Sequence, residues 1–362
     1  MREYLLTMLL AAAICYLVTP YVETYALRFG AIARIRERDI HTETTPRWGG
    51  VAMWFATSFT FVVVSHLPLV GKSFGREAQG IFLAGTFVVL LGMIDDRFEL
   101  DALTKLAGQA LAAGILLSFG VQLLWLPING LITLPASIGQ FLTVLVILVA
   151  INAVNFIDGM DGLASGIVAV SATAFFIFAY VLAVVYGFNR AGAPSTMSAV
   201  LIGVCLGFLP HNAYPAKIFM GDSGSMFLGL MLGASAITLT GQFDPNAISS
   251  ESTGPTFLPL LLPFAVLAIP LVDFGSAVIR RVRAGRSPFA PDNEHLHHKL
   301  FKAGNSKLRT VIIMYLWTAA IAFPVTTWAF APLWAAILVA VIFGGGSVLL
   351  MKRKGNKVEQ SN

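Results

Sequence analysis

Runs of about 20 apolar residues recur along almost the whole chain, and they limit the fold more than any other feature of the sequence. Of the 362 residues, 57% are hydrophobic and only 12% are charged. A soluble domain carries about twice that share of charge. Inside a bilayer every backbone N–H and C=O needs a partner within the protein, so packed helices are the practical architecture for such runs. The sequence therefore predicts an all-α integral membrane bundle.

The apolar runs predict about eleven transmembrane helices, and ten is the alternative because some runs are short or interrupted. The predicted helices lie near residues 4–22, 49–67, 79–94, 103–119, 138–154, 163–186, 197–213, 225–241, 256–279, 309–329 and 331–351. Together they form one polytopic membrane domain over residues 1–351. Residues 352–362 are polar and basic, and we expect them to form a disordered cytoplasmic tail.

One apolar stretch, from Gln122 to Ser137, does not fit a membrane helix. It is broken by Pro127, Asn129-Gly130 and Pro135. An Asn-Gly pair between two β-prone runs is typical of a tight hairpin. We therefore expect a small β-hairpin on the membrane surface there.

The basic residues are distributed very unevenly between the two sides of the predicted bundle. If the N-terminus lies outside and the chain alternates through eleven helices, twenty of the 24 Lys and Arg residues fall on one side. The other side has only Arg2, Lys72, Arg76 and Arg190. The positive-inside rule assigns the first side to the cytoplasm. Four polar clusters also fall on that side, so we expect one active site built from cytoplasmic loops. A secondary transporter, the alternative from a different functional class, would place more of its charges near mid-bilayer.

The first polar cluster is Asp95-Asp96, followed by Lys105. A carboxylate pair can share or accept a proton, and a lysine ammonium suits a phosphate. The alternative interpretation is an ordinary loop in which Asp residues cap the next helix and Asp101 pairs with Lys105 four residues on.

The second cluster is the segment NAVNFIDGMDG, in which Asn152, Asn155, Asp158 and Asp161 recur every three residues. This spacing places neighbouring side chains close together if the segment is helical. Their oxygens suit Mg²⁺, which uses one or two protein groups together with substrate phosphates. The alternative is a helix end with common turn residues.

The third and fourth clusters follow later in the chain. Asp222 lies in PAKIFMGDSGS, where a second carboxylate is available for metal and Ser223 could cap the following helix. His295, His297 and His298 lie in a basic loop; they lack the further ligand that a tetrahedral zinc site needs, and a loop that contacts a diphosphate is the better interpretation. Anionic lipid headgroups offer an alternative contact for its arginines.

In this order, GMIDD with Lys105, NAVNFIDGMDG, PAKIFMGDSGS and HLHH resemble the motifs of the polyprenyl-phosphate N-acetylhexosamine-1-phosphate transferases. The upstream HTETTPRWGG is similar to the first cytoplasmic loop of that family. The resemblance runs from about His41 to Leu300. It implies a multi-span enzyme, glycosyltransferase family 4, that transfers a sugar-1-phosphate from a UDP-sugar to a lipid phosphate with Mg²⁺ (Mn²⁺ as an alternative) and releases UMP.

The resemblance also implies roles for individual residues. Asp222 looks like the Mg²⁺-binding aspartate, with Asn155 sharing the metal. The expected catalytic residues are Asp95, Asp96, Lys105, Asp222, His297 and His298. The expected substrate-binding residues are Arg47, Asn152, Asp158, Asp161, Asn212, Phe219 and His295, and Phe219 is similar to the aromatic residue that stacks on uracil.

Within the family, His-Leu-His-His and Pro-Arg-Trp-Gly-Gly resemble the branch that uses UDP-GlcNAc. The peptidoglycan branch, which uses UDP-MurNAc-pentapeptide, has three adjacent histidines and is the alternative. We expect transfer of GlcNAc-1-phosphate to undecaprenyl or decaprenyl phosphate in the bacterial cytoplasmic membrane, as the first membrane step of a cell-wall polymer or surface polysaccharide. We expect no nucleic-acid partner, and a homodimer stays open.

Overall fold

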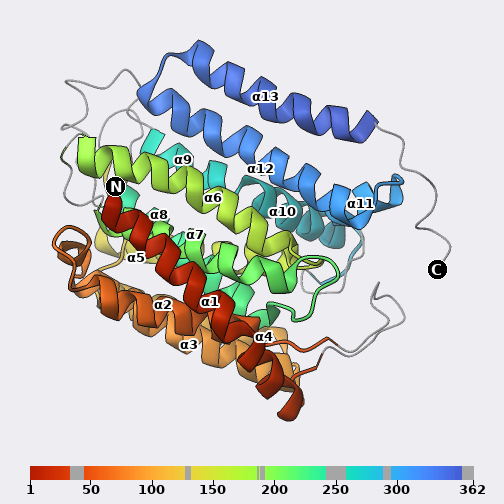
Figure 1. Cartoon of the computed structure of the whole chain (residues 1–362). Helices are drawn as coiled ribbons and strands as arrows, with labels where there is room; N and C mark the ends of the chain where they lie inside the picture. The colour runs from red at the N-terminus through yellow and green to blue at the C-terminus, as the bar shows by residue number, and fades with distance from the viewer. Residues whose placement is uncertain are drawn as a thin grey trace.

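The computed structural model describes residues 1–32, 45–126, 132–185, 187, 192–241, 258–287 and 295–352. These residues form a bundle of helices with a two-stranded ribbon at its edge (Figure 1). The elements are α1 (Arg2–Arg28), α2 (Gly49–Val64), η1 (Val70–Ser73), α3 (Arg76–Phe98), α4 (Ala102–Ser118), β1 (Trp125–Leu126), β2 (Ile132–Thr133), α5 (Ala136–Ile157), α6 (Leu163–Tyr180), the π-helical turn η2 (Val181–Val185), α7 (Gly192–Asn212), α8 (Gly221–Gly241), α9 (Leu258–Val266), α10 (Ala268–Arg283), α11 (Leu296–Lys302), α12 (Lys307–Phe330) and α13 (Leu333–Lys352).

The prediction of an all-α multi-pass membrane protein is confirmed. Within the described residues, eight helices are long and apolar enough to cross a membrane, and α2 and α4 are shorter apolar helices. Every predicted apolar run coincides with a helix or a pair of helices. The start of α1 and the end of α13 lie at opposite ends of the bundle (Figure 1). The count of ten to eleven spans stays a prediction.

The run near residues 256–279 differs from the single straight helix that we predicted. It is divided at Leu267 into α9 and α10, and Pro263 and Pro270 lie on either side of the break. Proline has no N–H and its ring clashes with the preceding turn, so a helix bends or stops next to it.

The predicted antiparallel pairing of the two strands is confirmed, while their place on the membrane surface stays a prediction. Trp125 lies opposite Thr133 and Leu126 lies opposite Ile132 in an antiparallel ribbon. The Asn129-Gly130 turn lies outside the described residues, as does the tail beyond Lys352.

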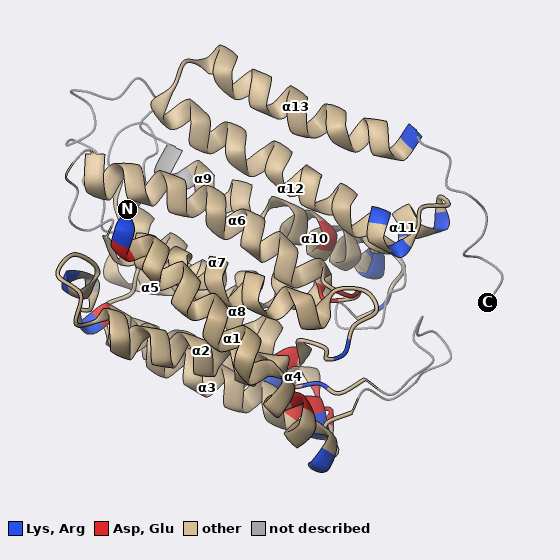
Figure 2. Ribbon diagram, viewed as in Figure 1, with Lys and Arg blue, Asp and Glu red and all other residues tan. Residues whose placement is uncertain are grey.

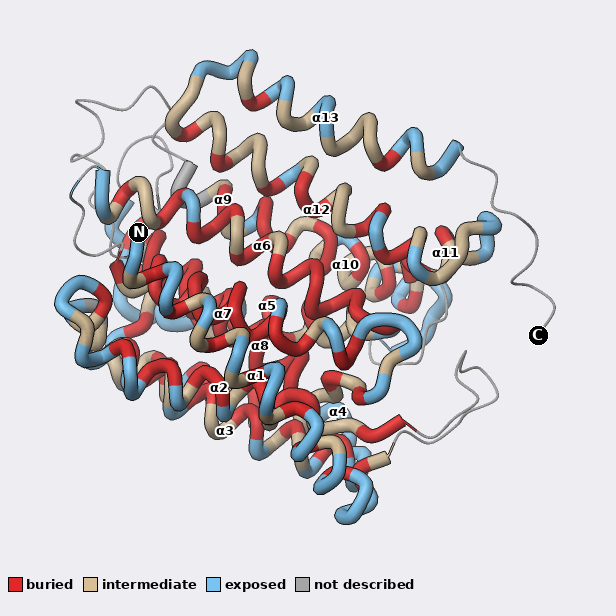
Figure 3. The backbone as a smooth tube through the Cα atoms, in the orientation of Figure 1, coloured by how far each residue is buried: buried red, intermediate tan, exposed pale blue. Residues whose placement is uncertain are grey.

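Helix α8 is the centre of the bundle. All residues in its most apolar membrane-length segment are buried, whereas 11% of the residues in the corresponding segment of α13 are buried. Figure 3 shows the same contrast between the central helices and α13. Glycines allow this close packing: a Cβ on Gly50 of α2 would lie 2.1 Å from the backbone nitrogen of Gly224, and one on Gly92 of α3 would lie 2.4 Å from the Cα of Ser223. The backbones of α2 and α3 therefore touch the first turn of α8.

Charged residues gather at the ends of the bundle, and most lie at the end where α3 stops and α4 begins (Figure 2). The start of α8 and the end of α5 lie there too, because Asp222 is bonded to Asp96 of α3 and to Asn155 of α5, and α11 lies on the same side of the bundle (Figure 1). All four predicted polar clusters therefore reach one end of the molecule.

Candidate active site

Lys105 joins two carboxylates from different helices. Its Nζ donates to Oδ2 of Asp95 at 2.8 Å and forms a second, shorter ion pair with Asp222. The alternative pair with Asp101 does not form. Asp101 instead caps α4 by accepting the N–H groups of the next turn, so Lys105 points away from it.

Asp96 holds the start of α8. Its Oδ1 accepts the N–H of Asp222 at 2.8 Å, and its Oδ2 accepts the N–H and the hydroxyl of Ser223 at 3.2 and 3.0 Å. The suggested cap by Ser223 is therefore wrong: this residue lies inside the first turn and donates to a carboxylate from α3. Gly221, with φ +70°, makes the approach possible, because a Cβ there would lie 2.5 Å from Oδ2 of Asp96.

The two asparagines of α5 face different partners. Asn155 Nδ2 donates to Oδ1 of Asp222 at 2.7 Å and to the hydroxyl of Ser225 at 2.8 Å. Asn152 donates to the side-chain oxygen of Gln109 at 2.7 Å. Thus Asn155 belongs to the carboxylate cluster, whereas Asn152 links α5 to α4 beside it.

Asp158 and Asp161 lie in the turn between α5 and α6. Burial, together with the charges of Asp222 and Asp96, raises the pKa of the Asp158 carboxyl to about 8, although the charge of Arg47 opposes this shift. Asp161 accepts the backbone N–H of Ala216 at 3.1 Å. The turn is therefore tied to the loop before α8.

The loop before α8 is held from two sides. Asn212, buried at the end of α7, accepts the N–H of Gly162 and donates to the carbonyl of Ile218, both at 3.1 Å. Phe219 donates its backbone N–H to Pro46 at 2.8 Å and accepts the N–H of Gly49 at 3.1 Å. The two bonds of Phe219 bring the loop before α2, and with it Arg47, next to Asp95, Asp96 and Asp222, which we call the acidic cluster.

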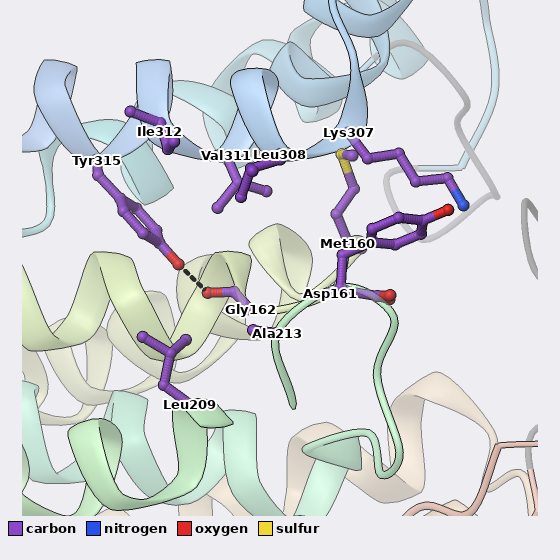
Figure 4. Close-up of a pocket in the computed structure, with 12 residues that line it drawn as sticks. Met160, Asp161, Gly162, Leu209, Ala213, Lys307, Leu308, Val311, Ile312 and Tyr315 are labelled. Carbon is purple, nitrogen blue, oxygen red and sulfur yellow. Dashed lines mark hydrogen bonds between the residues drawn. The ribbon is translucent and has the colours of Figure 1, made fainter. Parts of the chain in front are cut away.

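A cavity of about 130 Å³ lies between the 159–162 turn, the end of α7 and the start of α12 (Figure 4). Tyr315 of α12 donates its hydroxyl to the carbonyl of Gly162 in a very short hydrogen bond. Lys307 lies over the ring of Tyr214, 4.6 Å from its centroid. Sequence reasoning did not identify Tyr315, which is one tyrosine in a long apolar helix with no motif around it.

The histidines form a short helix, α11, where we expected a loop. His295 Nδ1 is hydrogen-bonded to Oδ2 of Asp273 at 2.8 Å, and Oδ1 of the same carboxylate accepts the N–H of Leu296 at 2.7 Å. The rings of His297 and His298 lie 4.3 Å apart. Sequence reasoning did not place Asp273 in the site. A lone Asp inside an apolar run was the signal that could have identified its partner.

His297 connects α11 to the turn between α5 and α6 that contains Asp158 and Asp161, which we call the acidic turn. It is 1% exposed, and neither of its ring nitrogens has a hydrogen-bond partner among the described residues. A Cβ on Gly159 would lie 2.7 Å from the ring of His297. Burial and the neighbouring His298 lower the pKa of His297 to about 3, so it is neutral at pH 7.

The structure therefore brings the predicted residues to one end of the bundle, but with unequal access. Asp222 has a side chain that is 27% exposed, compared with 9% for Asp95, while Asp96 and Asn212 are buried and engaged in internal bonds. Within the described ranges, no three His, Cys, Asp or Glu side chains are arranged to hold a metal on their own. A metal here would take its remaining ligands from substrate or water.

Known proteins are similar to this chain along most of its length. The model of glycosyl transferase family 4 matches residues 78–240, which contain the Asp95, Asp158 and Asp222 clusters. The decaprenyl-phosphate N-acetylglucosaminephosphotransferase of Mycolicibacterium smegmatis is 43% identical over 330 residues, covering 89% of this chain and 81% of that protein. The protein of the same name from Mycobacterium tuberculosis is 41% identical, covering 98% of this chain and 91% of its own.

A more distant relative is the undecaprenyl-phosphate alpha-N-acetylglucosaminyl 1-phosphate transferase of Escherichia coli, 25% identical over 83% of this chain and 77% of that protein. The resemblance of the ordered motifs is thus confirmed along nearly the full length of the chain. By this similarity, and with the family's clusters gathered at one end of its bundle, the chain belongs to glycosyl transferase family 4.

Proposed function

We propose that the protein transfers GlcNAc-1-phosphate from UDP-GlcNAc to a polyprenyl phosphate, forming polyprenyl-diphosphate-GlcNAc and releasing UMP. The observation that carries this proposal is the group of Lys105, Asp95 and Asp222 at the meeting point of four helix ends. Phosphoryl transfer depends mainly on positioning and charge neutralisation, which such a group supplies. The names of the relatives at 41–43% identity support the same reaction.

In this reaction an oxygen of the lipid phosphate attacks the sugar-bearing phosphorus, and the bond from that phosphorus to UMP breaks. A phosphate monoester has a second pKa near 6, so its attacking oxygen needs little help from a base. We therefore propose Lys105 and Arg47 as cations that offset the phosphate charge, and Asp95 as the carboxylate that holds Lys105. The buried bonds of Asp96 support a positioning role in fixing the start of α8.

We propose Mg²⁺ as the cofactor, held by Asp222 and Asn155 together with substrate phosphates. Asp222 is the most exposed carboxylate of the bonded cluster, and the Asn155 amide lies against it. Oxygen donors of this kind, one or two per site, suit Mg²⁺. When bound, the ion would neutralise diphosphate charge and stabilise departing UMP.

For the nucleotide we propose a pocket at Phe219, with Asp158 and Asp161 along its wall. Asn212 has both ends of its amide engaged by the chain, so it would shape this pocket by holding the loop before α8. His297 and His298 would contact the diphosphate. The unpartnered ring nitrogens of His297, aimed next to Gly159, support this contact.

For the sugar, we propose UDP-GlcNAc over UDP-MurNAc-pentapeptide, on the basis of His-Leu-His-His and of the named relatives. We further propose that the site faces the cytoplasm of a bacterial cytoplasmic membrane, as the positive-inside rule implies. The mycobacterial relatives favour decaprenyl phosphate as the acceptor, and the product would start a cell-wall or surface polysaccharide linkage unit.

The test is UMP release by the purified full-length protein with decaprenyl phosphate and Mg²⁺. UDP-GlcNAc should support turnover, and addition of EDTA should stop it until Mg²⁺ is restored. With both UDP-sugars present, the lipid product should contain GlcNAc. No UMP release, or a lipid-linked MurNAc-pentapeptide product, would refute the assignment.

A separate test addresses the sidedness. A cysteine in place of Leu100, between α3 and α4, should react with an impermeant thiol reagent only in inside-out vesicles. A cysteine in place of Lys72, between α2 and α3, should react only in right-side-out vesicles. The opposite pattern would place the site outside.

A further inference from the structure

Asp273 is a fully buried carboxylate in α10, at 0% exposure. A charge in such a place is costly unless both oxygens find partners. One oxygen accepts from the ring of His295 and the other from the backbone N–H of Leu296, at 2.8 and 2.7 Å. The carboxylate therefore ties α10 to His295 and to the first residue of α11, which lie 22 and 23 residues later.

These two bonds define the state of the His295 ring. An ionised carboxylate can only accept hydrogen bonds, so Nδ1 of His295 must carry a proton. This leaves Nε2 on the opposite edge of the ring. A carboxylate that orients a histidine in this way selects its tautomer, and loss of the charge can reverse that selection.

His295 contacts the acidic turn indirectly, through the ring of His297. Its ring is stacked on that of His297 with a centroid distance of 5.6 Å and an angle of 2° between planes. His297 in turn is packed against Gly159, next to Asp158. On its other side, His295 meets the edge of Phe156, whose face is covered by Arg281 at 5.0 Å.

We propose that Asp273 is a positioning residue for the transfer reaction: it fixes the Nδ1–H tautomer of His295 and docks the first turn of α11 against the 158–162 turn. The inference rests on the proposed transferase function. Asp273 itself touches no substrate. It acts through His295, so that the histidine cluster has one orientation before the diphosphate arrives.

The tautomer can be measured without any substrate. In protein with ¹⁵N-labelled histidines, the chemical shifts of the ring nitrogens distinguish Nδ1–H from Nε2–H, and His295→Gln identifies the signal among the six histidines. We expect His295 to carry its proton on Nδ1. In Asp273→Asn, the amide can keep the Leu296 bond through its oxygen and donate to Nδ1, so the His295 proton should move to Nε2. A wild-type Nε2–H tautomer would overturn the proposal whatever the variants do.

Kinetics then separate positioning from a merely structural role. Asp273→Asn should lower kcat by about 10²-fold or more, because the wrong tautomer misaligns the cluster in the transition state. KM for UDP-GlcNAc should change by less than about threefold, since binding by the uridine end is untouched. Ser276→Ala is the matched control: one turn along the same helix, it removes the hydrogen bond from Ser276 to the Asp273 carbonyl and the one from Arg280 to Ser276, and it should retain wild-type kcat.

A double mutant decides whether Asp273 acts through His295. If it does, Asp273→Asn should add almost nothing to the loss caused by His295→Gln. Additive losses, or wild-type kcat in Asp273→Asn, would overturn the proposal. A third result would also overturn it: Asp273→Asn lowers kcat and thermal stability but leaves the His295 tautomer unchanged. That result is expected if Asp273 only caps α11. Failure of the proposed function itself would be seen separately, as absent UMP release in the wild type.

Discussion

The acidic cluster at the start of α8 and the histidine helix α11 differ in how far the protein itself satisfies their polar groups. In the acidic cluster, Asp95, Asp96 and Asp222 all accept hydrogen bonds from the chain, and Lys105 bridges two of them. In α11, His295 is held by Asp273, but His297 is buried with no hydrogen-bond partner among the described residues.

This difference indicates that the two regions would respond differently to a bound ligand. The acidic cluster is already organised, so a cation or phosphate would exchange one set of charge contacts for another. Burial of an unpartnered polar group costs free energy, and such a group is usually found where a partner arrives from outside. A diphosphate beside His297 would provide that partner and would raise the pKa of the imidazole from its low value near 3.

The largest effect is expected at Asp222. Asp222→Asn should lower turnover by about 10³-fold or more, because the exposed carboxylate of the organised cluster loses its charge. UMP release under saturating Mg²⁺ measures it, with thermal stability recorded in parallel. The matched control is Asp101→Asn, since asparagine caps a helix about as well as aspartate and Asp101 lies outside the cluster. Near wild-type turnover in Asp222→Asn would remove this residue from the chemistry.

The next effect should come from the histidine side of the comparison. His297→Gln should lower kcat by about 10²-fold if the ring donates to the developing charge. His211→Gln is the control, because that ring contacts the carbonyl of Tyr16 in α1 and lies in none of the polar clusters. If His297→Gln retains the wild-type kcat, as the control should, the ring nitrogens of His297 have no part in transfer.

A smaller effect, on stability, should distinguish the buried cap from an exposed one. Asp96→Ala leaves the N–H groups of Asp222 and Ser223 without their acceptor and should destabilise the protein by about 2 kcal/mol. Asp101→Ala removes an exposed cap of α4 and should destabilise the protein less. Thermal melting in detergent compares the two variants. Equal losses would show that Asp96 contributes no more than an ordinary surface cap.

The smallest effect is a pH dependence of stability from His297. Its folded pKa, about 3, is below the unfolded value near 6.5, so the unfolded chain binds the extra proton first as the pH falls. Stability from this group is therefore complete above pH 6.5 and is lost progressively between pH 6.5 and 3. From pH 7 to 6 the loss should be less than about 1 kcal/mol, and His297→Gln should reduce it. An unchanged slope of melting temperature against pH in that variant would contradict the burial of a neutral imidazole.

Much of the architecture follows from local pattern. Apolar runs of membrane length predicted helices because a bilayer leaves the backbone no other partners, and the structure has helices in those places. The Asn-Gly pair predicted the antiparallel ribbon at Trp125 and Thr133 in the same way. The break at Leu267 was harder to predict, because prolines inside an apolar run either bend a helix or end it, and neighbouring helices decide which.

In the site, too, some features follow from the sequence and others depend on the three-dimensional structure. The order and spacing of the Asp, Asn and His motifs identified the residues and the family, since chemistry requires particular side chains whatever their surroundings. The pairings depended on three-dimensional structure. Lys105 has Asp101 four residues before it, yet it pairs with Asp95 and with Asp222, 117 residues away.

By itself the sequence determined the membrane bundle, the polar clusters and the family. Only the tertiary structure decided that Asp96 caps α8, that Asp273 holds His295, and that His297 is buried beside Gly159. The physical reason is range. Helix formation and membrane burial respond to neighbours within one or two turns, whereas a hydrogen bond between two helix ends exists only after the whole bundle has set where those ends lie.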